Sequence, residues 1–352
     1  MLPAKWDKIT STCAPILCST GKVSDSVPDE LLRIRNLHTH FFSREGVLKA
    51  VNGVDLTLKT GQILGVVGES GSGKTVTALS ILRLVPFPGR IMEGEIYLEG
   101  VDLLALDGDE LRDIRGREIS MIFQDPSSGL NPVIPIGKQV GELLAAHTRL
   151  SNREIQQMTL EILQQVGLPD PARVMGQYPF QLSGGMCQRV MIGIAMALNP
   201  KVLIADEPTS ALDMTIQAQI LHQIRRLREQ RGTAVILITH NLGVVAQMAD
   251  EVAVMYAGSV VEYGTVAEIF RAPAHPYTYA LLQALPRLDR ADAALHTIPG
   301  SPPNPLDLRD ECPFIGRCNK ALTECRISPR PKLTSIGPEH SVACYNPVVH
   351  LE

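Results

Sequence analysis

The sequence predicts an α/β fold with a mostly parallel sheet at its core, followed by a small cysteine-rich C-terminal domain. Runs of Val, Ile and Leu at the start of 61–85 and within 201–208 and 233–240 are continuous enough for strands buried on both faces. A glycine-rich loop separates the first of these runs from a helical pattern. A proline-rich stretch near residue 300 then gives way to clustered cysteines.

The composition is that of a folded globular chain. The 352 residues suit about two domains, and a content of 45% hydrophobic and 20% charged residues argues against disorder. A net charge of −4 gives no basic field, so we expect no nucleic-acid partner. No apolar run approaches the ~20 residues of a membrane helix, and the N-terminus lacks the apolar core of a secretion signal. We therefore expect a cytoplasmic chain that serves a membrane only through another subunit.

Local patterns predict the first elements in order along the chain. Residues 1–30 mix Ser, Thr, Pro and charged residues without a period, which predicts a loosely ordered extension. Residues 31–41 alternate in the manner of a β-strand, and 61–85 predicts a strand, a glycine loop and a helix.

A mostly helical stretch is expected before the second apolar strand. Ser151 and Glu154 form a capping-box pattern at the start of a predicted helix over 151–168, which closes at Gly167. Beyond about residue 285 the texture changes to a proline-rich linker, "IPGSPPNPLDL".

The segment "GESGSGKT" (68–75) matches a phosphate-binding loop, and its place between a strand and a helix supports the match. The glycines let the backbone wrap a phosphate, while successive N–H groups and the helix N-terminus face the anion. Lys74 is expected to reach the β- and γ-phosphates, and the Thr75 hydroxyl to ligate Mg²⁺. The other nucleotide-binding residues expected in this loop are Gly68, Glu69, Ser70, Gly71, Ser72 and Gly73.

Two acidic residues end the apolar run in "VLIADEPTSALD" (202–213). Asp206 can hold Mg²⁺ through water, and Glu207 can polarise the attacking water, a role that needs a carboxylate beside the γ-phosphate. Taken alone, the two residues could instead cap a helix. His240 ends the next predicted strand, level with Asp206, and is expected to contact the γ-phosphate.

A second anion-binding helix N-terminus is predicted in "QLSGGMCQR" (181–189), where Ser183, Gly184 and Gly185 precede a helix. One γ-phosphate does not need two such cradles from a single chain, so paired chains that close each other's sites explain the second one. The glycine loop, this signature segment, the Asp-Glu strand end and the histidine follow one another in family order. With them the sequence resembles the ATP-binding cassette (ABC) family over residues 31–285.

The resemblance implies an ABC ATPase domain at 31–285 that binds ATP and Mg²⁺. Its expected parts are a RecA-like parallel sheet core, an antiparallel β region and a helical subdomain at about 125–195. Phe41 in "LHTHF" matches the aromatic residue that stacks on adenine. Phe42 beside it leaves the register open by one position, and core packing of Phe41 is an alternative.

Further roles follow from the same resemblance. Gln124 in "IFQDP" matches the glutamine that contacts Mg²⁺ and the attacking water, so the expected catalytic residues are Glu207, His240 and Gln124. The loop from Ser210 to Asp213 matches the one that crosses the dimer interface. The residues expected to bind the ATP of a partner chain are Ser183, Gly184, Gly185 and Asp213.

Two residues depart from the family's pattern. Asn241 stands where an aspartate usually follows the histidine, and we expect a modest electrostatic change. Cys187 takes a commonly basic position in the signature segment, where an inert thiol is expected. Neither departure removes a catalytic group, so we expect an active ATPase.

Other segments resemble the di- and oligopeptide importer branch, which also contains nickel importers. They are "ISMIFQDPSSGLNP" (119–132), "HPYTYALLQALPRL" (275–288) and the linker "IPGSPPNP" into a C-terminal domain at 286–352. The branch implies a peripheral ATPase on the cytoplasmic face of the inner membrane. Its implied partners are a second, non-identical ABC ATPase subunit, two transmembrane permease subunits and an extracytoplasmic substrate-binding protein. Alternatives are an importer of nickel or another small solute, and a soluble ABC ATPase that acts on ribosomes or DNA.

Four cysteines of the tail follow the spacing C-x5-C-x6-C-x18-C. Four thiolates can complete a [4Fe–4S] cluster or a zinc site, but structural zinc favours closely spaced C-x2–4-C pairs. The pattern also resembles the cluster-binding tail of peptide-importer ATPases. We therefore expect a [4Fe–4S] cluster, with Zn²⁺ or free thiols as alternatives. The expected ligands are Cys312, Cys318, Cys325 and Cys344.

The segment "CPFIGRCNKALTEC" (312–325) carries three further expectations. Arg317 and Arg326 adjoin cysteines, and they either offset thiolate charge or belong to a solvated surface. The tail has too little apolar sequence to fold by burial alone, so metal binding is expected to supply its folding energy. We expect the segment to stay outside the ATP site.

Overall fold

The computed structural model describes residues 30–210, 212–284 and 297–348. The predicted N-terminal extension therefore lies outside the described residues, apart from Glu30. Among the described residues, no helix combines the length and the apolar character needed to span a membrane.

The chain divides into two compact units, each described by itself. What we call the glycine-loop unit contains Leu32–Leu58, Ile63–Tyr97 and the chain from Leu237 onward. What we call the helical unit contains Lys59–Gln62 and Leu98–Ile236. The division passes through strand β8 (Ala234–Ile238).

A parallel strand pair forms the core of the glycine-loop unit. β3 (Ile63–Val67) runs parallel to β9 (Glu251–Tyr256), and both strands are almost wholly buried. The chain then turns back into β10 (Ser259–Thr265), which is antiparallel to β9. β12 (Ser341–Val342), from the C-terminal tail, pairs with the free edge of β10. The parallel pairing of β3 and β9 confirms the predicted arrangement. Continuous apolar strands are typical of such sheets, because both faces of a parallel sheet are covered.

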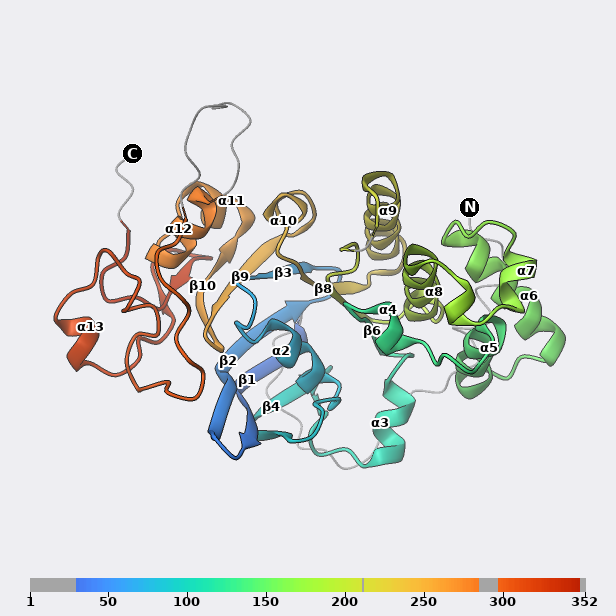
Figure 1. The fold of residues 1–352 in the computed structure, drawn as a ribbon, viewed down its shortest axis with the longest axis horizontal. Helices are drawn as coiled ribbons and strands as arrows, with labels where there is room; N and C mark the ends of the chain where they lie inside the picture. Colours follow the sequence, from blue (N-terminus) through green and yellow to red (C-terminus); the bar gives the residue numbers. More distant parts are fainter. Residues whose placement is uncertain (1–29, 211, 285–296, 349–352) are drawn as a thin grey trace. The chain divides into compact units, whose positions relative to one another are not determined.

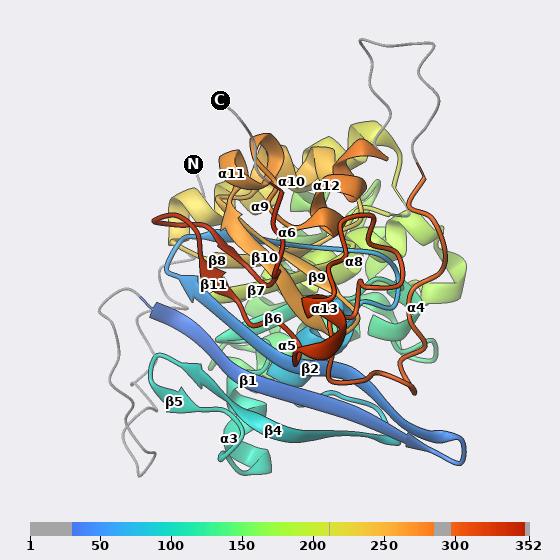
Figure 2. The ribbon, with the colours of Figure 1, turned by 90° about the vertical axis from the view of Figure 1, so that its left-hand side faces the viewer.

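A second sheet of the same unit has the strand order β2–β1–β4. β1 (Glu30–Ser43) and β2 (Gly46–Lys59) are joined by a tight turn and form the long hairpin visible in Figure 2. β4 (Gly89–Leu98) lies on the other side of β1. The hairpin accounts for the expected antiparallel region.

Helices cover the parallel strands of this unit. α10 (Leu242–Met248) packs on β3, and α11 (Val266–Arg271) packs on β9 and β10. Figure 1 shows α10, α11 and α12 on one side of these strands, with β1, β2 and β4 on the other. The unit's remaining elements are α2 (Lys74–Ile81), α12 (Pro276–Gln283), α13 (Glu324–Ile327) and β11 (Thr334–Ser335).

The helical unit is built on a second parallel pair, β6 (Ile119–Ile122) and β7 (Val202–Asp206). α6 (Asn152–Gln165) and α8 (Gly184–Met196) pack together at a close approach, where a Cβ atom on Gly193 would lie 3.0 Å from Ile162. The unit's remaining elements are β5 (Val101–Asp102), α3 (Gly108–Ile114), α4 (Pro126–Gly129), α5 (Ile136–His147), α7 (Pro171–Met175), the 3-10 turn η1 (Pro179–Gln181) and α9 (Met214–Arg231).

The predicted start of α6 is confirmed in detail. The Ser151 hydroxyl accepts from the Glu154 N–H at 3.4 Å, and the Glu154 carboxylate accepts from the Ser151 N–H at 2.9 Å. The two residues thus satisfy N–H groups that a helix start leaves without intrahelical partners. α6 ends just before Gly167, whose φ of +71° lies in the left-handed region.

The C-terminal tail is anchored in the core of the glycine-loop unit by an aromatic side chain. Phe314 is 2% exposed, and its ring lies 5.3 Å from the ring of Tyr256 and 5.5 Å from that of Tyr277. Cys312 belongs to the same buried cluster. Burial of this aromatic ring contributes stability to the tail without a metal. That metal binding supplies the rest of the folding energy of the tail stays a prediction.

We predict that Phe314→Ala lowers the free energy of unfolding by about 3 kcal/mol, because it removes a buried ring and leaves a cavity. Phe180→Ala is the matched control, since Phe180 is 74% exposed. Urea unfolding of both variants provides the measurement. Equal stabilities of the two variants would contradict the anchoring role.

Candidate active site

The predicted phosphate loop connects β3 to α2 and is closely packed from two sides. Gly68, with a φ of +149°, has so little space that a Cβ atom there would lie 2.2 Å from the Met255 carbonyl oxygen. Gly73, with a φ of +99°, would bring a Cβ atom to 2.4 Å from the Ala50 carbonyl oxygen. Any side chain at either position would displace backbone, so only glycine fits.

Lys74, the first residue of α2, lies within the loop rather than in solvent. It is 8% exposed, and its ammonium group donates to the carbonyl oxygens of Gly68 at 2.9 Å and Glu69 at 2.8 Å. A third bond, at 3.2 Å, reaches the Ser72 hydroxyl. A buried ammonium requires such partners, and here they keep the positive charge at the loop that is expected to receive phosphate. Thr75 follows, half-buried, at the start of the same helix.

In the helical unit, three predicted residues emerge from neighbouring strand ends. The parallel register pairs Ile122 of β6 with Ala205 of β7, so Gln124 and the Asp206–Glu207 pair leave the sheet at the same edge. Asp206 is 1% exposed, whereas Gln124 is exposed. A carboxylate buried as deeply as that of Asp206 requires compensation of its charge, which suits a group expected to hold Mg²⁺.

Glu207 has a left-handed backbone, with a φ of +47°. This region is unfavourable for a residue with a Cβ atom, typically by about 1–2 kcal/mol. Strain of this kind persists only where the surroundings impose it, and it is frequent at functional sites. The conformation therefore agrees with a catalytic role for Glu207, which sequence patterns alone suggested.

The signature segment forms the start of α8. The Ser183 hydroxyl caps this helix by accepting from the Met186 N–H at 3.3 Å, and the helix dipole is thus available to an anion. Gly184 is exposed, and a Cβ atom there would meet nothing within 4 Å. Asp213 caps α9 in the same manner, accepting from the Ile216 N–H at 3.0 Å.

The starts of α8 and α9 lie near each other. A Cβ atom on Gly185 would be 3.4 Å from the side chain of Leu212, and the Gln188 amide donates to the Pro208 carbonyl at 2.9 Å. The structure therefore brings the signature segment and the loop before Asp213 together within one unit. Cys187 is half-buried in this region, and burial raises the pKa of its thiol, as the expectation of an inert cysteine requires.

Asn241, one of the two departures from the family pattern, has a structural role. Its side-chain oxygen accepts from the N–H groups of Gly243 at 3.0 Å and Val244 at 3.3 Å, which caps α10. His240, directly before it, is exposed at the end of β8. Because asparagine and aspartate cap helices about equally well, the departure leaves the local backbone unchanged.

The structure describes Phe41 as half-buried and Phe42 as 40% exposed on the same strand. The Phe41 ring lies so close to Gly89 that a Cβ atom there would be 2.7 Å from it. Phe41 therefore packs against β4, and the choice between the two phenylalanines as the base-stacking residue remains a prediction.

The predicted site residues thus form two groups, one in each unit. Those of the glycine-loop unit are Phe41, Gly68, Glu69, Ser70, Gly71, Ser72, Gly73, Lys74, Thr75 and His240. Those of the helical unit are Gln124, Ser183, Gly184, Gly185, Asp206, Glu207 and Asp213.

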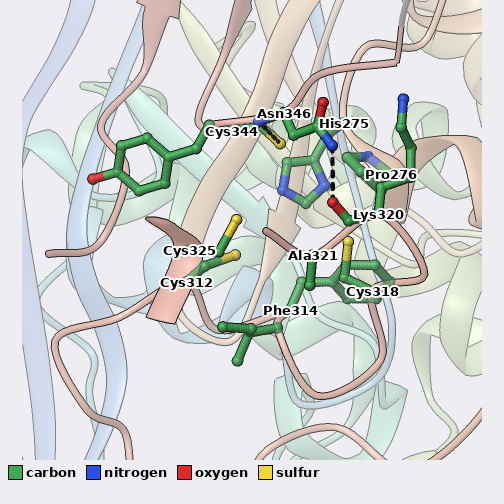
Figure 3. Close-up of a pocket in the computed structure, with 12 residues that line it drawn as sticks. His275, Pro276, Cys312, Phe314, Cys318, Lys320, Ala321, Cys325, Cys344 and Asn346 are labelled. Carbon is green, nitrogen blue, oxygen red and sulfur yellow. Dashed lines mark hydrogen bonds between the residues drawn. The ribbon is translucent and has the colours of Figure 1, made fainter. Parts of the chain in front are cut away.

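All four cysteines of the tail line a single pocket (Figure 3), and their sulfur atoms face a common space. Cys312 and Cys325 are buried, Cys318 and Cys344 are half-buried, and all four are free thiols. In the described ranges, no three His, Cys, Asp or Glu side chains are arranged to hold a metal ion.

The pocket disfavours charge on three of its thiols, because burial raises the pKa of Cys312, Cys318 and Cys344. Burial, with smaller effects from the other three cysteines, raises the pKa of Cys344 to about 11. Burial also lowers the pKa of His275, another lining residue, to about 4, so this ring is neutral at pH 7. Thiolates in such surroundings require a strong counter-charge, which a bound metal supplies.

Two expectations about the cysteine segment are wrong. The side chain of Arg317, expected beside the thiols or in solvent, is 6% exposed and forms an ion pair with Glu69 of the phosphate loop, at 2.7 Å. Consequently the segment contacts the loop that is predicted to bind nucleotide. Arg326 is exposed, in agreement with the solvated alternative.

Sequence reasoning also missed a second contact with the loop. The Tyr277 hydroxyl accepts from the Glu69 N–H at 2.8 Å, although the two residues are 208 positions apart. Tyr277 lies in "HPYTYALLQ", which indicated only the branch of the family. No local period or spacing relates either Tyr277 or Arg317 to the loop.

Comparison with known proteins identifies two regions of the chain. Residues 51–210 match the "ABC transporter" family model, and residues 261–325 match "Oligopeptide/dipeptide transporter, C-terminal region". The chain is 46% identical over 316 residues to the oligopeptide transport ATP-binding protein AppD of Bacillus subtilis, covering 90% of this chain and 96% of that protein. It is 47% identical over 307 residues to the oligopeptide transport ATP-binding protein OppD of Haemophilus influenzae, covering 87% and 94% of the two chains.

A solved structure gives a similar result for the fold. The dimeric post-hydrolysis state of the ATP-binding cassette MJ0796, bound to ADP and Pi, matches with a TM-score of 0.61 at 30% sequence identity. The match covers 67% of this chain and 98% of that one.

We predict that Asn241→Ala lowers the free energy of unfolding by about 1 kcal/mol, because α10 loses its side-chain cap. Asn241→Asp retains both hydrogen bonds and adds a charge that favours a helix N-terminus, so its stability is expected to match or slightly exceed that of the parent. Urea unfolding of the three proteins distinguishes them. An alanine variant as stable as the parent would show that the cap contributes nothing.

Proposed function

Because the chain belongs to the ABC transporter family, in its oligopeptide/dipeptide branch, we propose that it hydrolyses ATP to power the import of di- or oligopeptides. The observation that carries this proposal is the presence of both matched regions in one chain, the cassette at 51–210 and the peptide-transporter region at 261–325. Relatives that match over nearly their whole length are named as oligopeptide and dipeptide transport proteins. No observation favours nickel as the cargo or a ribosome or DNA as the target.

Each predicted residue has its own assigned part in the ATPase chemistry. The phosphate-loop N–H groups and Lys74 bind the β- and γ-phosphates, and their positive charge stabilises the charge that develops during transfer. Glu207 accepts a hydrogen bond from the attacking water and orients it, and Gln124 and His240 contact the water and the γ-phosphate.

Mg²⁺ is the expected partner of the nucleotide. Thr75, Gln124 and Asp206 are the residues proposed to hold it, Asp206 through water. When bound, Mg²⁺ neutralises charge on the phosphate oxygens. The deep burial of the Asp206 carboxylate and the placement of Thr75 beside Lys74 support this assignment.

The signature segment serves the ATP of a second chain. Ser183, Gly184 and Gly185 present a capped but accessible helix N-terminus, and Asp213 lies at the start of the adjacent helix. We infer a closed pair of ATPase chains, in which the partner is a second, non-identical ABC ATPase subunit. Closure and opening of this pair would drive a rigid-body switch in two transmembrane permease subunits, which receive peptide from an extracytoplasmic binding protein. The chain would then lie on the cytoplasmic face of the inner membrane.

For the tail we propose a [4Fe–4S] cluster held by Cys312, Cys318, Cys325 and Cys344. Four free thiols that face one pocket support it, because four thiolates are the ligand set of such a cluster. The four cysteines lack the closely spaced C-x2–4-C pairs of structural zinc sites, which weighs against zinc. The cluster would join the three parts of the tail that carry these cysteines, which is a structural role.

We predict that Glu207→Gln retains ATP binding but lowers kcat by roughly 100-fold or more, because the amide cannot take up the proton of the attacking water. In cells whose only copy of the gene carries the substitution, uptake of a labelled tripeptide should fall to background. The matched control is Glu229→Gln, an exposed glutamate on α9.

The two readouts separate the two parts of the proposal. Wild-type turnover in the Glu207→Gln protein would refute the catalytic assignment. Loss of turnover with normal peptide uptake would support the ATPase assignment but refute the proposal that this ATPase powers peptide import.

We predict that the chain purified under anaerobic conditions is brown and absorbs near ~400 nm, as cysteine-ligated iron–sulfur clusters do. Iron and sulfide analysis should give about four of each per chain. Replacing Cys318 with Ser should abolish the colour, whereas replacing Cys187, which lies in the helical unit, should not. A colourless protein with stoichiometric zinc would overturn the cluster.

A further inference from the structure

One side chain of the cysteine segment enters the phosphate loop. The guanidinium group of Arg317 meets the carboxylate of Glu69 with two parallel contacts, Nη1 to Oε2 at 2.7 Å and Nη2 to Oε1 at 3.0 Å. This paired geometry is the strongest and most directional way for a cation to bind a carboxylate. The Arg317 side chain is 6% exposed and that of Glu69 is 25% exposed, so solvent screens the pair only partly.

Arg317 is fixed on its other sides as well. Its Nε donates to the Pro299 carbonyl at 3.0 Å, and its Nη1 also donates to the Tyr256 hydroxyl at 3.3 Å. The guanidinium carbon lies 5.9 Å from the ring of Tyr256 and 6.0 Å from that of Phe314. Because its donors and faces are occupied, this arginine is a rigid element and not a mobile surface residue.

Glu69 connects this rigid element to the phosphate-binding lysine. Its carboxylate binds Arg317, its N–H donates to the Tyr277 hydroxyl, and its carbonyl oxygen accepts from the Lys74 ammonium group at 2.8 Å. All three polar groups of one loop residue are therefore held at once. These three contacts of Glu69 restrain the backbone of the loop between Gly68 and Lys74.

We propose that Arg317 is a positioning residue of the ATP site, which holds Glu69 and thereby keeps the phosphate loop in the conformation that accepts nucleotide. A loop that is already ordered loses less conformational entropy when it binds phosphate, so the contact increases affinity for nucleotide. The proposal depends on the chain being an ATPase. It does not depend on the cargo or on the metal in the tail.

The alternative is that the ion pair merely fastens the tail to the rest of the unit. The two roles differ in what they change. Fastening affects the free energy of unfolding and leaves the folded protein's affinity for nucleotide as it was. If the pair positions the loop, its loss raises Kd and KM while leaving kcat at saturating ATP nearly unchanged, because Glu69 and Arg317 are not assigned to the attacking water.

The test uses the full-length protein as purified, with ADP binding measured by calorimetry and ATP turnover by steady-state kinetics. Arg317→Gln should raise the Kd for ADP and the KM for ATP about tenfold, within the usual range of coupling between contacting residues. Saturated kcat should stay within about twofold. Arg326→Gln, an exposed arginine of the same segment, is the control and should change neither quantity.

A double-mutant cycle makes the assignment specific to the pair. Glu69→Gln should raise Kd and KM about as much as Arg317→Gln, and the double variant should be no worse than either single one. Arg317→Lys, which keeps the charge but loses the paired geometry, should recover part of the affinity. The double variant also leaves no unpaired charge, so it provides a folded protein if Arg317→Gln alone is unstable.

Unchanged Kd and KM in Arg317→Gln would overturn the proposal and leave only a fastening role. Additive effects in the double variant would overturn it as well, because the two residues would then act independently. A fall in kcat without a change in KM would assign the pair to chemistry instead. Absence of turnover in the parent and in every variant, including Arg326→Gln, would point to failure of the ATPase assignment itself.

Discussion

The close packing of the phosphate loop is the constraint around which the glycine-loop unit is organised. Gly68 lies against the carbonyl of Met255, Gly73 lies against that of Ala50, and the Gly258 N–H donates to the Ser72 carbonyl at 3.0 Å. The loop is therefore surrounded by backbone from β2, from the end of β9 and from the turn between β9 and β10. Backbone cannot retreat as a flexible side chain can, so these strands and the loop hold each other in place.

The residues of the loop itself could be predicted from the sequence, whereas the strands that pack against it could not, because those strands are distant in the sequence. The pattern "GESGSGKT", the capping box of α6 and the buried apolar runs of β3, β7 and β8 are local, and each was predicted correctly from neighbouring residues. β9, β10 and α9 passed unnoticed. α9 was missed because its apolar residues are few and lie on one face. β9 and β10 were missed because no spacing in the sequence relates them to β3.

The contacts of the tail illustrate the limit more sharply. Arg317 stands 248 positions from Glu69, and its sequence neighbour Cys318 suggested a role toward the thiols. A charged residue beside a candidate ligand could serve either group, and only the fold decides between them. Phe314 presented the same difficulty, because an aromatic residue without apolar neighbours at a regular spacing gives no period from which burial could be inferred.

The pairing of β12 with β10 has a consequence for how such proteins can vary. Together with Arg317 and Phe314, it makes the tail part of the same hydrogen-bonded unit as the phosphate loop, and not a detachable appendage. A tail transplanted from another chain would have to supply new partners for Glu69, Tyr256 and Tyr277. Substitutions at positions 69 and 317 should accordingly occur together among related chains. The tail and the nucleotide loop are then expected to evolve as one unit.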